Sequence, residues 1–199
     1  MPQVWGKVKI PEGKKIAVNL GCDFDAQSLW ICLNRTSPAY MSRGEFGAEV
    51  GLPRLMRLFD KYKVKGTFCI PGHTIDTWPD DTWPELCREV AAAGHEIGHH
   101  GYAHENPQSL KLQEEIKVME LGLEALARIG VKPRTYRAPY WDFSENTLGL
   151  LERYGCEIDR VCSPTIFIPT GFGRSRCTPS AATCSARRAA SWRFPDSGT

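Results

Sequence analysis

Four of the chain's five histidines fall within the stretch HEIGHHGYAHE, which runs from His95 to Glu105. His100 and His104 are four residues apart, a spacing that puts two imidazoles on one face if the segment forms a helix. Two histidines and one carboxylate can hold a catalytic metal ion such as zinc and leave a position open for water. Asp23 or Asp25 could supply that carboxylate, and spacing alone does not decide which of them binds.

Hydrolysis at such a site also needs a base beside the attacking water, and the second aspartate of the pair supplies one. A competing interpretation is structural, because histidine pairs at this spacing also arise by chance. His95 is expected to be structural, and His99 could belong to a buried turn. For His73 a structural role and a substrate-facing role both remain open.

The elements that must position these residues can be predicted from apolar periodicity and end signals. Short apolar runs predict strands at 16–24, 66–72, 96–101, 134–141 and 157–162. Helical spacing predicts helices at 48–64, 80–94, 109–130 and 144–155, with Ser109 and Ser144 as N-caps. Gly94, Gly130 and Gly155 are expected to end three of them, and residues 27–47 to form a long loop.

This alternation of strands and helices predicts an α/β fold with a parallel sheet, either doubly wound or an incomplete barrel. In both architectures the functional groups gather at the carboxyl ends of the strands. That edge would bring together the polar residues that follow the first four strands, namely Asp23, Asp25, His73, His99, His100, Arg137 and Tyr140.

Bulk composition narrows the class of protein. The chain has 199 residues, 42% of them hydrophobic, and a formal charge of +2, which gives no reason to expect nucleic acid or an anionic membrane as partner. The first residues contain no signal-like apolar run, and no run of apolar residues is long enough to span a membrane, so we expect a cytoplasmic protein. Its eight cysteines include no CxxC pair, and most are expected to be reduced and buried.

Composition changes near residue 162. Residues 163–199 contain five arginines, no lysine and one aspartate, and they show no helical or strand periodicity. We therefore expect a catalytic domain at 1–162 and an irregular or disordered tail at 163–199. The tail could be a natural flexible segment or the product of a shifted reading frame. Its arginines fall short of a nucleic-acid-binding motif.

Three motifs together resemble the polysaccharide deacetylases, carbohydrate esterase family four with the NodB-like domain. They are DFD at 23–25, HGYAH at 100–104 and RAPYW at 137–141. The resemblance covers about residues 10–162, and Gly101 stands where the family usually has Ser or Thr. Flanking segments are most similar to the cytoplasmic branch, which includes peptidoglycan-deacetylase-like, cyclic imide hydrolase and allantoinase-like enzymes.

The resemblance implies a role for each matching residue. Asp23 would be the general base, paired with Arg137, and the backbone N–H around Tyr140 would stabilise the oxyanion. Asp25, His100 and His104 would hold a divalent metal, with zinc as the expected ion. His73 and Trp141 are candidate substrate contacts.

The resemblance also implies a deformed (β/α) barrel, expected here to be incomplete at the C-terminus. No histidine follows His104, so the family's late general acid has no counterpart in this chain. The predicted function is metal-dependent hydrolysis of a non-peptide C–N bond, in a cyclic imide or ureide or in an N-acetylated sugar, with the small cyclic substrate slightly favoured. The alternative is a non-catalytic product with a partial metal site. Open strand edges would favour a homo-oligomer.

Overall fold

The computed structural model describes residues 12–13, 15–16, 18–76 and 82–159 of the chain. The tail predicted at 163–199 and the last residues of the fifth predicted strand lie outside these ranges.

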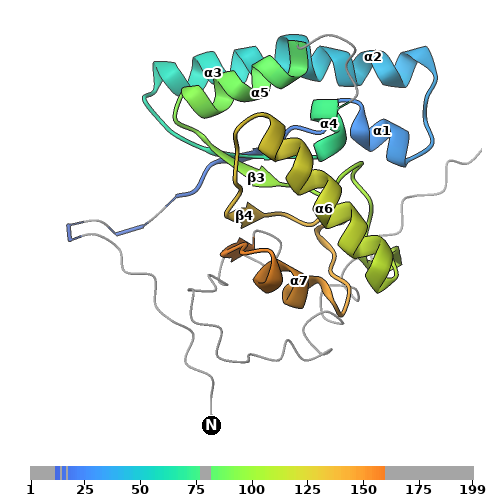
Figure 1. Ribbon diagram of the computed structural model, residues 1–199. Coiled ribbons are helices and arrows are strands. Elements are labelled where there is room, and N and C mark those ends of the chain that lie inside the picture. Colours follow the sequence, from blue (N-terminus) through green and yellow to red (C-terminus); the bar gives the residue numbers. More distant parts are fainter. Residues whose placement is uncertain (1–11, 14, 17, 77–81, 160–199) are drawn as a thin grey trace, which may run out of the picture. The chain divides into compact units, whose positions relative to one another are not determined.

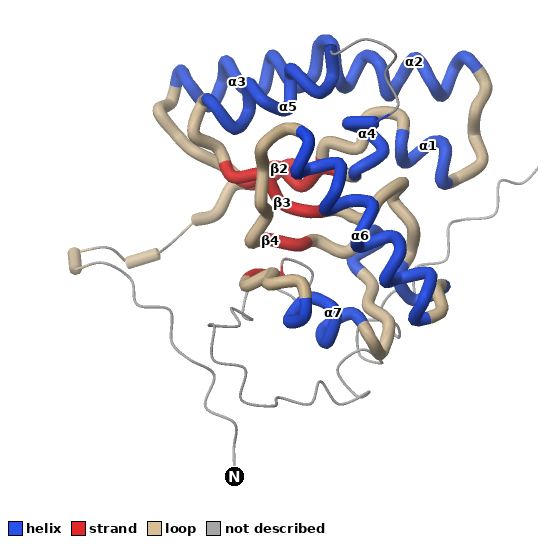
Figure 2. Tube along the Cα trace, viewed as in Figure 1, coloured by secondary structure: helices blue, strands red, loops and turns tan. Residues whose placement is uncertain are grey.

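Within the described residues, five short parallel strands form one sheet, as predicted. They are β1 (Gly21–Asp23), β2 (Thr67–Ile70), β3 (Glu96–His99), β4 (Thr135–Tyr136) and β5 (Ile158–Asp159). Each strand pairs with the next along the chain, in the order β1-β2-β3-β4-β5 (Figure 2). A doubly wound sheet would reverse its strand order partway, so this sequential order is that of a (β/α) barrel.

Helices connect the strands and cover them. The α-helices are α1 (Ser28–Cys32), α2 (Pro38–Phe46), α3 (Leu52–Lys61), α4 (Gly72–Asp76), α5 (Thr82–Ala92), α6 (Leu112–Arg128) and α7 (Thr147–Arg153). A π-helical turn, η1 (Gly47–Gly51), joins α2 to α3, and the 3-10 turns are η2 (Pro107–Ser109) and η3 (Pro139–Trp141). Figure 1 shows α3, α5, α6 and α7 following one another around the strands. Within the described ranges, every helix is too short or too polar to span a bilayer.

The loop predicted at 27–47 was wrong, because this segment contains α1 and α2. Glycines at 44, 47 and 51 lower helix propensity and conceal the pattern. Packing explains one of them, since a Cβ at Gly44 would lie 2.7 Å from the carbonyl carbon of Ala26. The missing side chain lets α2 lie directly against the turn that follows β1, and this contact outweighs local propensity.

Apolar side chains form two core clusters. The larger lies between β2, β3 and the helices α3, α5 and α6, and contains the fully buried Phe68, Ile70 and Trp83. The smaller joins Met119 of α6 to Tyr136 of β4 and to α7. Each large apolar side chain buried in this way contributes roughly 1.5–3 kcal/mol to folding. The expected burial of cysteines holds for Cys69, Cys87 and Cys156, whereas Cys32 is exposed.

The predicted helix stops are confirmed, but both predicted N-caps were wrong. Gly94, Gly130 and Gly155 follow their helices with positive φ angles of 79°, 77° and 75°. The residue before α6 is Lys111, not Ser109, and its N–H donates to Glu114 Oε2 at 2.8 Å.

Asn146, not Ser144, precedes α7. The Ser144 hydroxyl instead donates to Glu115, a buried carboxylate on α6 that also accepts the Thr147 hydroxyl, each at 2.5 Å. A tertiary contact with α6 therefore fixes the start of α7.

Candidate metal centre

Strand ends bring the predicted polar residues together. β1 ends at Asp23, β3 at His99 and β4 at Tyr136, and the sheet is parallel throughout. Asp25, His100 and Arg137 therefore follow strands that end at the same edge of the sheet. The interatomic distances confirm that these side chains form one cluster at this edge.

Asp25, His100 and His104 form a triangle of metal-ligand atoms, all within 4.8 Å of one another. His100 Nε2 lies 3.5 Å from Asp25 Oδ1, and His104 Nε2 lies 3.8 Å from Asp25 Oδ2. Ligand atoms about 2.0–2.1 Å from a tetrahedral zinc ion lie roughly 3.4 Å apart. The separations of 3.5 and 3.8 Å are therefore close to the spacing that a small divalent ion needs.

A helix between His100 and His104, the condition under which their spacing would put both imidazoles on one face, does not form. Residues 100–106 contain no helix, and His104 has a positive φ of 66°. A loop turns back on itself instead, and brings the two imidazole centroids to 5.0 Å with their planes nearly perpendicular. The spacing of four selected the same two histidines that the loop brings beside Asp25, although no helix joins them.

Both histidines present a neutral imidazole. Burial lowers the pKa of His100 to about 4, against the opposing effect of the Asp23 charge, and burial also lowers the pKa of His104. His100 Nδ1 lies 2.6 Å from the carbonyl oxygen of Arg137 and donates its proton there. Nε2 of His100 therefore keeps a lone pair directed at Asp25, the arrangement that a metal-binding histidine requires.

Asp25 supplies a carboxylate with one oxygen that has no hydrogen-bond partner within the described part of the chain. Its Oδ1 atom is buried and accepts no hydrogen bond there. Burial raises the pKa of Asp25 to about 7, and the neighbouring Asp23 charge adds to this effect. A divalent cation would neutralise this carboxylate and satisfy its oxygen, so the donor set fits a metal ion.

Asp23 is held by Arg137, as expected. Arg137 Nη1 donates to both carboxylate oxygens, at 2.6 and 2.7 Å. These two hydrogen bonds restrict the rotation of the carboxylate. Asp23 therefore stands beside the metal triangle as a carboxylate with a fixed direction.

Tyr140 and Trp141 border the site in a strained turn. Both have positive φ, 59° and 55°, a conformation that costs bulky residues about 1–3 kcal/mol. The Tyr140 ring meets the His104 ring edge to face, with centroids 4.9 Å apart. Trp141 is 69% exposed. The oxyanion role of Tyr140 and the substrate contact of Trp141 stay predictions.

The remaining histidines pack in different ways. His95 is buried and its Nδ1 accepts the Gly66 N–H at 3.1 Å, which agrees with a structural role. His99 is fully buried between the Met119 carbonyl and the Gly101 N–H. His73 is half-buried, and its substrate contact also stays a prediction.

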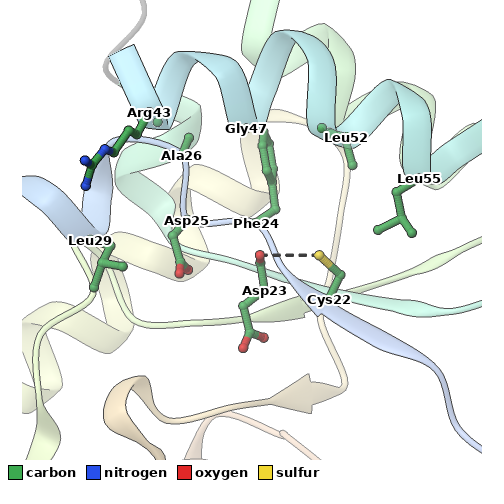
Figure 3. A pocket seen from close by; sticks show the side chains of 12 residues that line it. Cys22, Asp23, Phe24, Asp25, Ala26, Leu29, Arg43, Gly47, Leu52 and Leu55 are labelled. Atoms are coloured by element: carbon green, nitrogen blue, oxygen red, sulfur yellow. Dashed lines mark hydrogen bonds between the residues drawn. The ribbon is translucent and has the colours of Figure 1, made fainter. Parts of the chain in front are cut away.

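An open hollow of about 400 Å³ adjoins the carboxylate pair. Figure 3 shows the Asp23 and Asp25 carboxylates pointing to the same side, away from the helix that carries Leu52 and Leu55. Phe24 points toward that helix instead, as strand alternation requires. His100 and His104 do not line the hollow, so it lies behind the metal triangle.

Glu105 is a site residue to which the sequence assigned no role. Its Oε2 atom accepts the backbone N–H groups of Tyr102 at 3.1 Å and Ala103 at 2.8 Å. Both amides belong to the loop between His100 and His104, the two histidines of the triangle. Gly101 has a positive φ of 72° here and offers no hydroxyl where the family usually has Ser or Thr. A carboxylate directly after His104 was the available signal.

Replacing Glu105 with alanine is expected to weaken zinc affinity about 10–100-fold, the usual effect of removing a group that orients metal ligands. Glu114→Ala is the matched control, because Glu114 also accepts a backbone N–H from three residues earlier, at Lys111. Calorimetric titration of both variants with zinc measures the effect. Equal affinities for the two variants would contradict a role for Glu105 in shaping the loop.

Comparison with known proteins gives the same family as the motifs. The sequence profile of the family described as polysaccharide deacetylase matches residues 45–158. The chain is 38% identical over 159 residues to a peptidoglycan deacetylase of Helicobacter pylori, covering 78% of this chain and 53% of that protein.

Comparison with solved structures supports the same family. A candidate polysaccharide deacetylase from Mycobacterium smegmatis superposes with a TM-score of 0.69 at 39% identity, covering 76% of this chain and 53% of that one. An allantoinase superposes with a TM-score of 0.54 at 25% identity, covering 62% and 39%.

The chain spans about half the length of the curated relatives it matches. The matched region nevertheless includes most of the described fold and the histidine pair, and it takes up more than half of the chain. The chain therefore belongs to the polysaccharide deacetylase family.

Proposed function

We propose that the chain is a metal-dependent hydrolase that removes the acetyl group from an N-acetylated amino sugar. The observation that carries this proposal is the Asp25–His100–His104 triangle with the Asp23–Arg137 pair beside it. The similarity to a peptidoglycan deacetylase supports the sugar as substrate.

Zinc is the proposed ion, held by Asp25, His100 and His104. An ion held there would supply Lewis acidity, which polarises an amide carbonyl and makes a nearby water more acidic. Side chains of the protein itself carry out the remaining steps. Asp23 accepts the proton of the attacking water, and Arg137 keeps the Asp23 carboxylate aligned for this step.

Stabilisation of the oxyanion is assigned to the backbone N–H at Tyr140, whose positive φ sets the direction of that turn. His73 and Trp141 are proposed to contact the substrate. The exposed indole of Trp141 suits a sugar ring, since aromatic faces pack well against the apolar face of a pyranose.

A cyclic imide or ureide is the second candidate substrate. The sequence slightly favours it, and the superposition with an allantoinase supports it. A third possibility, the alternative that the sequence left open, is a chain that binds metal without hydrolysis. We also propose that the protein is cytoplasmic, as expected from its sequence.

Acetate release from zinc-loaded protein tests the function. We expect acetate from N-acetylglucosamine oligomers or peptidoglycan, and no ring opening of five-membered imides or ureides. Ring opening without acetate release would replace the sugar by the second candidate. Inactivity on both classes despite bound zinc would identify the chain as a non-catalytic metal binder.

Self-association is a separate proposal. Within the described ranges, no strand pairs with the outer edge of β1 or of β5. Open edges of this kind can pair with another copy of the chain. Light scattering of the purified chain would show a dimer or larger species, and a monodisperse monomer would contradict the proposal.

A further inference from the structure

Two buried hydroxyls lie behind the metal ligand Asp25. The Asp25 carbonyl oxygen accepts the backbone N–H of Ser28 at 2.8 Å and the hydroxyl of Thr74 at 3.0 Å. Ser28 begins α1 after β1, whereas Thr74 lies on α4 after β2. Both side chains are fully buried. The backbone of the ligand is thus tied to the neighbouring strand–helix unit.

The direction of each hydrogen bond in this group can be worked out. A carbonyl oxygen cannot donate a hydrogen bond. The only hydroxyl proton of Thr74 is therefore donated to the Asp25 carbonyl oxygen. Ser28 Oγ lies 2.9 Å from Thr74 Oγ1 and must therefore be the donor to it. His73 Nδ1 lies 3.4 Å from Ser28 Oγ, which has no proton left to give, so His73 is the donor there.

The three hydrogen bonds therefore point in one direction, from His73 to Ser28, from Ser28 to Thr74, and from Thr74 to the Asp25 carbonyl oxygen. This direction requires His73 to carry its proton on Nδ1. Since Ser28 and Thr74 have 0% exposure, water cannot replace either hydroxyl without opening the structure.

We propose that Ser28 and Thr74 are positioning residues that hold Asp25 in its metal-binding orientation, with His73 as the outermost donor. The turn they fix contains Ala26, a non-glycine residue with a positive φ of 46°. A backbone in that conformation needs outside contacts to keep it there. The carbonyl held by the two hydrogen bonds belongs to Asp25 itself, so releasing it would let the carboxylate swing away from His100 and His104. This inference rests on the proposed metal site.

Four variants of the full chain test the proposal. Thr74→Val keeps the shape and removes the hydroxyl, whereas Thr74→Ser keeps the hydroxyl and removes the methyl group. Ser28→Ala removes the second hydroxyl. Thr67→Val is the matched control, because Thr67 is also buried on the β2 unit and donates to Glu96 Oε2 at 2.7 Å, at the opposite end of the strand.

Two readouts are measured. Zinc affinity by calorimetry is expected to fall about tenfold or more in Thr74→Val, and to stay within about threefold of wild type in Thr74→Ser and Thr67→Val. Hydrogen exchange of the Ser28 amide, in metal-free protein, is expected to speed up about fivefold in Thr74→Val and Ser28→Ala only.

Wild-type zinc affinity in Thr74→Val, or a Thr74→Ser variant as impaired as Thr74→Val, would overturn the proposal. If the wild-type chain itself binds no zinc, the proposed function fails. The hydrogen-exchange rates alone then test the positioning role. Faster exchange of the Ser28 amide in Thr74→Val and Ser28→Ala only would support that role. Unchanged exchange in these two variants would refute it.

Discussion

Replacing Asp23 with asparagine is expected to lower kcat/KM for deacetylation roughly 10²–10⁴-fold, the range that general-base catalysis contributes. Asparagine keeps the size of the side chain and can still accept a hydrogen bond from Arg137, but its amide cannot take a proton from water. Zinc affinity is expected to change little, because Asp23 is not one of the three ligand residues. Steady-state assays and zinc titration measure the two effects.

Asp60→Asn is the control for this comparison. Asp60 also pairs with a cation, Lys63, at 2.9 Å, but it lies on the exposed surface of α3. Its loss is expected to leave hydrolysis and zinc affinity unchanged. An Asp23→Asn variant that keeps wild-type activity would exclude Asp23 as the base, and one that loses zinc would make it a ligand.

Gly122→Ala is expected to destabilise the protein by about 3 kcal/mol or more, from overpacking and a disrupted buried hydrogen bond. A Cβ at this position of α6 would lie 2.4 Å from His99 Nε2 and 2.8 Å from the Gly101 carbonyl oxygen. His99 cannot move aside easily, since it is fully buried and donates to the Met119 carbonyl at 3.0 Å. Denaturant unfolding monitored by circular dichroism measures the change.

Gly149→Ala provides the matched comparison on another helix. A Cβ at Gly149 of α7 meets no atom within 4 Å, so only helix propensity changes. This variant is expected to gain up to about 1 kcal/mol. A Gly122→Ala variant as stable as Gly149→Ala would show that α6 does not approach His99 as closely as described.

Several features of the fold follow from local chemistry and could be predicted. Short apolar runs located all five strands, and their alternation with helical patterns gave the parallel sheet. The three glycines expected to end helices do so, because each adopts a positive φ that other residues disfavour. The parallel direction of the strands is enough to predict that Asp25 and His100 lie at the same edge of the sheet.

Other features depend on contacts that a local pattern cannot show. Helix α2 contains Gly44 because it packs against Ala26, so its helical signal is weak. His104 reaches the site through a loop stabilised by Glu105, which no periodicity predicts. Ser28 stood in a segment expected to be a loop, and the sequence assigned Thr74 no role, so their contact with Asp25 was not foreseeable.

The most direct test of the metal centre is elemental analysis of the purified chain after dialysis against zinc, beside a His104→Ala variant. The geometry of the Asp25, His100 and His104 atoms predicts about one zinc ion per chain in the wild type and a large loss in the variant. A wild-type chain without bound metal after this treatment, or a variant that keeps the full amount, would contradict the assignment of this triangle as the metal site.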